Sequence, residues 1–237
     1  MLAAVLLALA AVQVAARVLG RPTLSARLLP RMEGGAPYLI WALRLWSAFG
    51  LPAVVALLLL GRAGALTTMP AEFSPATAFV RRFAPIEAWS VLLGLALGGV
   101  LGALIAWRRL RRGKGLASLG RPPRLPRARG ELPAAALLAL SAGVAEELYF
   151  RLALPLLIAL VSGSAWVGFA VAAAAFGAVH RYQGPAGMLV TGLVALLLSA
   201  VYLGSGSLWL AMGCHAAIDL NALVVRPWLA LKVGRAG

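Results

Sequence analysis

Residues 132–161 read LPAAALLALSAGVAEELYFRLALPLLIALV, and their only charges lie in the hexapeptide from Glu146 to Arg151. A helix needs roughly 20 apolar residues to cross a bilayer, so this stretch of about 30 residues is long for one upright crossing. The sequence predicts either one tilted helix or two helical pieces. Each ionisable side chain at the centre of a membrane helix costs on the order of 2.5–3.5 kcal/mol on insertion scales, so the hexapeptide indicates a functional site.

Apolar runs of membrane-spanning length recur along the whole chain. Of its 237 residues, 62% are hydrophobic and only 12% are charged, which is outside the range of soluble globular domains. We therefore predict an all-α, polytopic transmembrane helical bundle of about seven spans, with about six to eight as the range. The predicted spans are residues 2–16, 38–60, 88–107, 132–161, 164–179, 185–203 and 208–225.

Basic residues are concentrated between these runs. The formal net charge is +15, and residues 108–129 carry nine basic residues and no acidic one. Lysine and arginine in short loops mark the cytoplasmic side, so this segment is predicted to be a cytoplasmic loop. If residues 132–161 cross once, the same rule places the N-terminus outside. No soluble domain remains to present a basic face, so we predict no nucleic-acid partner.

The chain divides into four predicted regions. Residues 1–107 form the N-terminal spans, and residues 108–131 form the basic cytoplasmic loop. Residues 132–225 form a transmembrane core that carries the chemistry. Residues 226–237 form a short basic tail.

The two glutamates of the hexapeptide are predicted to differ in role. On a helix, Glu147 and Arg151 lie four residues apart on one face, in the acid-before-base order that favours an ion pair. Glu146 lies about 100° away round the helix and cannot share that geometry. Glu147 is therefore predicted to be structural, and Glu146 to be a general base.

Both histidines of the chain lie in or beside predicted spans. His180 ends the fifth span, and His215 lies inside the last one with Asp219 four residues later on the same face. Taken singly, such residues can be interfacial or can make simple polar contacts between helices. Because all of them fall in three segments that helix packing can bring together, we predict one shared site. A single upright crossing would leave Glu146 near mid-bilayer and His180 near the cytoplasmic end, so a tilt, a break or a water-filled funnel is needed.

Metal-dependent hydrolysis is an alternative. Two histidines and two glutamates are ligand types that zinc uses, with water as a further ligand. No HExxH pair is present, and Glu147 is already assigned to Arg151. Cys214 is the only cysteine, which excludes a multi-cysteine site and fits a packed residue of a membrane helix. We predict no metal and no cofactor.

Three spaced motifs resemble one family. They read EExxxR at Glu146 to Arg151, FxxxH from Phe176 to His180, and HxxxD from His215 to Asp219. This set, in this order and inside membrane spans, is similar to the CAAX-protease and bacteriocin-processing (CPBP, or Abi) intramembrane proteases. Many members have asparagine where this chain has Asp219. The resemblance covers about residues 132–225.

The resemblance implies an intramembrane glutamic endopeptidase that hydrolyses a peptide bond with an activated water. Glu146 would be the base, and His180 would help to hold the water. His215 and Asp219 would steady the oxyanion and its surroundings, while Glu147 and Arg151 would brace the helix and Phe176 would support the site. The expected partners are the lipid bilayer and a membrane-associated protein substrate. The expected location is a cell membrane, namely the cytoplasmic membrane of a prokaryote. The alternative function is a non-proteolytic scaffold or transporter that uses the buried polar cluster.

Overall fold

The computed structural model describes residues 1–20, 34–116 and 124–233. Within these ranges every regular element is helical and no strand occurs, so the predicted all-α class is confirmed. Parts of the predicted basic loop and basic tail, residues 117–123 and 234–237, lie outside the described residues. The proposed division at residues 107, 131 and 225 stays a prediction.

Five helices of the described chain are long and apolar enough to cross a membrane. They are Leu2–Leu19 (α1), Ala36–Leu59, Ala88–Arg111 (α6), Arg181–Ser205, which includes α10 (Gly184–Ser205), and Leu208–Lys232. The helix that carries the buried charges, and the shorter apolar helix α9 (Ala165–Val179), are added to these. This tally agrees with the predicted count of about seven spans.

Three of the long helices contain a π-helical turn, and each turn is followed two residues later by a proline. The turns η2 (Trp46–Gly50), η6 (Leu148–Ala153) and η8 (Asn221–Val225) precede Pro52, Pro155 and Pro227. Proline lacks the N–H that an α-helix requires, and its ring clashes with the carbonyl four residues earlier. A widened turn relieves that clash without ending the helix.

These turns join shorter helices into continuous ones. Helices α3 (Ala36–Leu45) and α4 (Leu51–Leu59) continue through η2, and α11 (Leu208–Leu220) and α12 (Arg226–Lys232) continue through η8. Helices α7 (Leu132–Glu147) and α8 (Leu154–Ser162) continue through η6. Residues 132–161 therefore lie in one kinked helix rather than in two pieces.

Residues 61–87, which lie between the predicted spans 38–60 and 88–107, contain a further helix. Helix α5 spans Ser74–Phe83 and follows the short 3₁₀ turns Ala63–Leu66 and Ala71–Phe73. The side chain of Arg81 donates from Nε to the carbonyl of Gly204, 3.1 Å away, at the end of α10. This bond ties α5 to the bundle.

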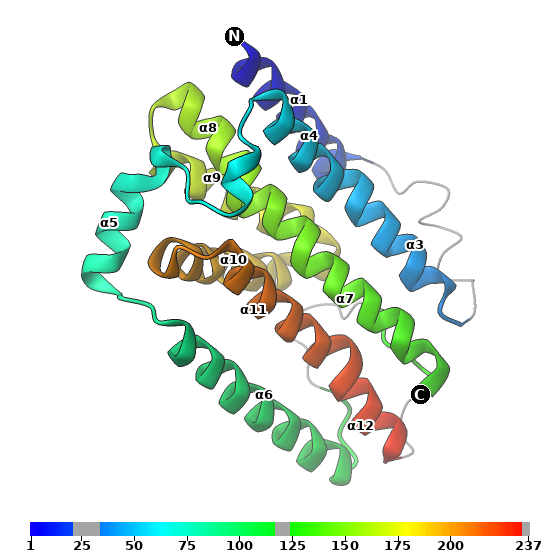
Figure 1. The fold of residues 1–237 in the computed structure, drawn as a ribbon. Coiled ribbons are helices and arrows are strands. Elements are labelled where there is room, and N and C mark those ends of the chain that lie inside the picture. The colour runs from blue at the N-terminus through cyan, green and yellow to red at the C-terminus, as the bar shows by residue number, and fades with distance from the viewer. Residues whose placement is uncertain (21–33, 117–123, 234–237) are drawn as a thin grey trace.

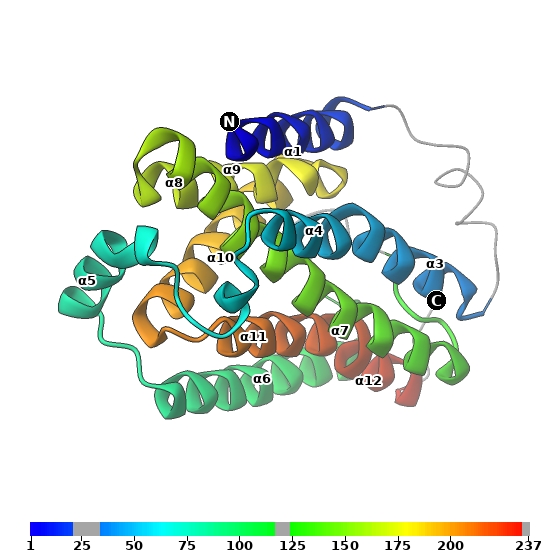
Figure 2. The ribbon, with the colours of Figure 1, turned by 45° about the horizontal axis from the view of Figure 1, so that its top comes forward.

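Helix α7 runs through the middle of the bundle, with α3 packed on one side and α11 on the other (Figures 1 and 2). Helix α6 lies at the edge, beside α11 and α12. The last turn of α6, the first turn of α7 and the last turn of α12 lie at the same end in both views. Basic residues gather at this end, and its assignment to the cytoplasmic side stays a prediction.

The turn η6 lies in the hydrophobic core. All six of its residues are buried, and the ring of Phe150 lies 5.0 Å from that of Phe49 and 5.1 Å from that of Phe176. These are normal separations for interacting aromatic side chains. Helices α4, α8 and α9 thus hold the widened turn that follows the two glutamates.

Candidate active site

Three helices bring the predicted site residues together. The end of α7 and the turn η6 supply Glu146, Glu147 and Arg151. The end of α9 supplies Phe176 and His180, and α11 supplies His215 and Asp219, as the sequence predicted.

A close approach of α7 and α11 sets the register between them. A Cβ atom added at Gly143 would lie 2.8–2.9 Å from the backbone and Cβ of Ala216, which is too close for any side chain. Small residues at such a crossing allow two backbones to come near each other. Gly143 lies one turn before Glu147, and Ala216 follows His215, so this crossing places His215 against the glutamates.

Glu147 is the centre of the polar cluster. Its Oε1 atom lies 2.9 Å from Nη1 of Arg151, so the ion pair predicted from the four-residue spacing is present. The same oxygen accepts a 2.7 Å hydrogen bond from Nδ1 of His215. All three side chains are buried, so Glu147 both neutralises the guanidinium and fixes the orientation of the imidazole.

Glu146 is held differently from its neighbour. It is also buried, but it makes no hydrogen bond with any described residue. Its Oε2 atom lies 3.7 Å from Nε2 of His215, beyond hydrogen-bond distance. Its carboxylate lone pairs therefore stay available, which is the state required of a general base.

His180 has a defined tautomer. Its Nδ1 atom donates a 2.8 Å hydrogen bond to the carbonyl of Phe176, because a carbonyl can only accept. In the neutral ring, Nε2 is then an acceptor. The ring of Phe176, one turn before His180, lies 5.1 Å from that of Phe150, so the kinked helix and the end of α9 do meet.

The ring of Phe176 separates the two histidines. Its centroid lies 4.6 Å from the ring of His180 and 5.9 Å from that of His215. The guanidinium carbon of Arg151 lies 4.5 Å from the same centroid, in cation–π geometry. Phe176 therefore packs against three charged or titratable side chains of the cluster.

Asp219 lies at the open edge of the cluster. Its side chain is 30% exposed, compared with 7% for Glu146, and its Oδ2 atom is 3.7 Å from Nε2 of His215. The predicted meeting of His215 and Asp219 is thus a close approach without a direct hydrogen bond. Asn221 points elsewhere and donates to the carbonyl of Gly99 in α6, 3.4 Å away, as expected from its position on another face.

Two further observations bear on the sequence predictions. Cys214 is buried and has no disulfide partner, in keeping with a packing role. Among the described residues, no three histidine, cysteine, aspartate or glutamate side chains are grouped so that they could hold a metal ion.

The hydrogen bond between His215 and Glu147 was missed by sequence reasoning. The spacing of Glu147 and Arg151 fully accounted for that carboxylate, and the histidine lies 68 residues away in the chain. The one available signal was Gly143, one turn before Glu147, which marks a face where another helix can approach.

Comparison with known proteins identifies the segment that carries these residues. Residues 128–221 match the family described as type II CAAX prenyl endopeptidase Rce1-like. The predicted family resemblance is confirmed over this segment. It spans about two-fifths of the chain and contains all three motifs. No curated protein and no solved structure matches the chain.

The apolar helices describe a multi-pass membrane protein, and residues 128–221 within it are similar to the Rce1-like CAAX proteases. The family implies a peptidase, and therefore a protein substrate in the membrane. The match ends at residue 221, just beyond Asp219, so the whole polar cluster lies inside it.

Proposed function

We propose that this protein is an intramembrane endopeptidase in which Glu146 activates a water molecule that hydrolyses a peptide bond. The observation that carries the proposal is that two adjacent glutamates differ in their hydrogen bonds and ion pairs. Glu147 is paired with both Arg151 and His215, whereas Glu146 has no hydrogen-bond partner among the described residues. Inside an Rce1-like peptidase segment, a buried carboxylate that accepts no hydrogen bond and lies 3.7 Å from the imidazole of His215 suits a general base.

The proposed water lies between Glu146 and Nε2 of His180. Glu146 accepts one proton of the water. The oxygen of that water attacks the carbonyl carbon of the scissile peptide. The C–N bond then breaks, and the proton held by Glu146 passes to the departing amine nitrogen. This is a single displacement, so no acyl-enzyme forms.

His215 is proposed to stabilise the oxyanion. Its Nδ1–H is already committed to Glu147, so it can donate from Nε2 only as the imidazolium. Glu146, Glu147 and Asp219 surround this ring, and their charges favour that form. Asp219 cannot donate while ionised, so its proposed role is to orient His215 from the open edge of the site.

The proposed substrate is a membrane-associated protein, of which a prenylated C-terminal segment is the class that the family description names. The partly exposed edge at Asp219 and His180 is the side from which a peptide could enter. We place the protein in a cell membrane, with this edge nearer the basic, cytoplasmic end.

The direct test compares membrane proteomes of cells that express the wild type or Glu146→Gln. Cleavage by the wild type should create new protein termini that are absent with the nearly isosteric variant. Glu87→Gln, in an exposed carboxylate before α6, is the matched control and should retain them. Identical termini in all three strains would contradict the proteolytic function and favour a scaffold.

Metal dependence is tested separately on purified protein. Exhaustive chelation should leave cleavage unchanged, because the proposed chemistry uses only side chains and water. Stoichiometric zinc together with chelator-sensitive cleavage would overturn the glutamate mechanism in favour of a metal-bound water.

A further inference from the structure

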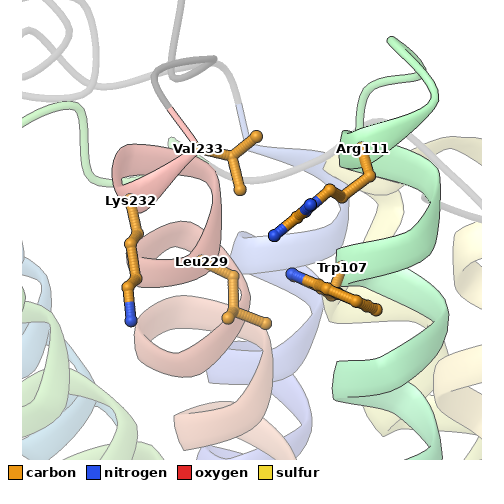
Figure 3. Close-up of a pocket in the computed structure, with 5 residues that line it drawn as sticks. All are labelled: Trp107, Arg111, Leu229, Lys232 and Val233. Atoms are coloured by element: carbon orange, nitrogen blue, oxygen red, sulfur yellow. The ribbon is translucent and has the colours of Figure 1, made fainter.

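A hollow of about 390 Å³ lies between the ends of α6 and α12, well apart in sequence from the glutamates. It is lined by Trp107, Arg111, Leu229, Lys232 and Val233 (Figure 3). Both helices end here, at the end of the bundle where basic residues gather. The proposed function assigns no role to this hollow.

The polar groups that face the hollow are donors. Arg111 extends from α6 toward α12, and the indole nitrogen of Trp107 faces the same space. The guanidinium of Arg111 lies 4.8 Å from the centroid of Trp107, a stacking arrangement that leaves its edge N–H groups free to donate. Leu229 and Val233 form the apolar wall on the α12 side.

Lys232 adds charge at the rim. In Figure 3 its side chain runs along the far side of α12, and its Nζ atom lies 5.2 Å from the ring centroid of Trp228. The four-carbon stem of lysine is flexible, so the ammonium can approach an anion held between the helices.

None of the described residues that line the hollow is acidic. The chain has no acidic residue between residues 88 and 130 and none after Asp219. Within the described part of the chain, Arg111 and Lys232 take part in no ion pair or hydrogen bond. Arg109 and Arg226 are also close enough for their charges to interact unfavourably. A hollow whose charged side chains are both cationic, and whose guanidinium and indole N–H groups can donate, suits an anionic ligand.

The position of the hollow indicates the source of that anion. Tryptophan is enriched at membrane–water interfaces, and Trp107 and Trp228 lie at this level. The adjoining surface of α6 is apolar and exposed at Leu101, Leu104 and Ile105, where acyl chains can lie. The positive-inside rule explains why basic residues lie at this end of the bundle. It does not explain why donor groups line a hollow between two helices. Basic pockets of this kind between membrane helices bind acidic lipid head groups.

We propose that the hollow binds the phosphate group of an anionic phospholipid, with Arg111 as its main ligand. The full-length protein in detergent would be titrated with phosphatidylglycerol, with phosphatidylcholine of the same acyl chains, and with inorganic phosphate, and binding followed by native mass spectrometry. Phosphatidylglycerol should bind more tightly than phosphatidylcholine. Arg111→Gln should weaken that binding about fivefold, the effect of one charge near a membrane surface.

Arg112→Gln is the matched control, because it removes the same charge from the next, exposed position outside the hollow. It should change phosphatidylglycerol binding less than about twofold, whereas Arg111→Lys should keep most of it. Equal weakening by Arg111→Gln and Arg112→Gln, or equal binding of both lipids, would overturn the proposal. Binding of inorganic phosphate alone, lost in Arg111→Gln, would support the phosphate site and assign it a soluble source. Peptide cleavage by Arg111→Gln should be unchanged, so this test is independent of the proposed function.

Discussion

Two membrane helices of this protein, α6 and the kinked helix of α7, η6 and α8, differ in almost every respect. Between Glu87 and Arg108, α6 has no charged residue, and most of its apolar side chains are exposed. The kinked helix has three charges near its middle, and every residue of η6 is buried. In this protein the ionisable groups lie where the same helix and its neighbour α11 supply polar partners, whereas the exposed helix at the edge is purely apolar.

Glycine serves the two helices differently as well. Gly143 in α7 is where α11 comes closest, and a Cβ atom there would overlap Ala216. Gly94 and Gly98 in α6 have no atom within 4 Å of where a Cβ atom would lie. Of these two helices, only the one that carries the chemistry has a glycine at which a Cβ atom would overlap a neighbour. Three substitutions can test this contrast.

Replacing Arg151 with alanine should have the largest effect on stability. It leaves Glu147 buried with only His215 as a partner, and breaking a buried ion pair costs about 3–5 kcal/mol. The measurement is reversible unfolding in mixed detergent micelles. Arg62→Ala is the control, because its pair with Glu72 is at the surface and should cost about 0–1 kcal/mol. Similar losses in both variants would remove the distinction between core and periphery.

Gly143→Ala should cost about 1–3 kcal/mol, because α7 and α11 must move apart to admit the new methyl group. The same displacement should draw His215 away from Glu147, so cleavage should fall together with thermal stability. Gly98→Ala in α6 is the matched control and should lower neither. If both variants behave like the wild type, the helix crossing does not set the register of the site.

Asn221→Ala should have the smallest effect. Its side chain donates to the carbonyl of Gly99 and is a polar link between α6 and η8. Hydrogen bonds between membrane helices average about 0.6 kcal/mol, so the unfolding free energy should fall by about that amount. Cleavage should stay unchanged, and a loss of cleavage would indicate that α6 takes part in the site.

The sequence was sufficient to predict the fold class and a count of about seven spans, and the structure brings the residues assigned to the site close together. The length of an apolar run indicates a membrane span, and the four-residue spacing of Glu147 and Arg151 predicts their ion pair. Both signals are local in the sequence. Helix α5 was missed because its segment contains three prolines and reads as a loop, although Pro75 falls in the first turn, where proline is tolerated. The proline positions also suggest, in retrospect, where the π-helical turns lie.

Contacts between distant segments could not be predicted. Nothing near His215 in the sequence indicates that its Nδ1–H binds Glu147 rather than Asp219, since the choice depends on how α7 and α11 cross. The hollow between α6 and α12 could not be predicted either, because its residues come from helix ends more than a hundred positions apart in the sequence. These features depend on packing, which a single sequence does not encode locally.

The central claim is that adjacent glutamates have separate roles, and one paired measurement tests it. Glu146→Gln and Glu147→Gln would be purified, and cleavage per folded molecule and thermal stability measured for each. Glu146→Gln should keep wild-type stability and lose at least about 100-fold in cleavage, as expected for removal of a general base. Glu147→Gln should unfold at a markedly lower temperature, because Arg151 loses its counter-charge. Equal stability and equal cleavage in the two variants would contradict the assignment of one base and one structural carboxylate.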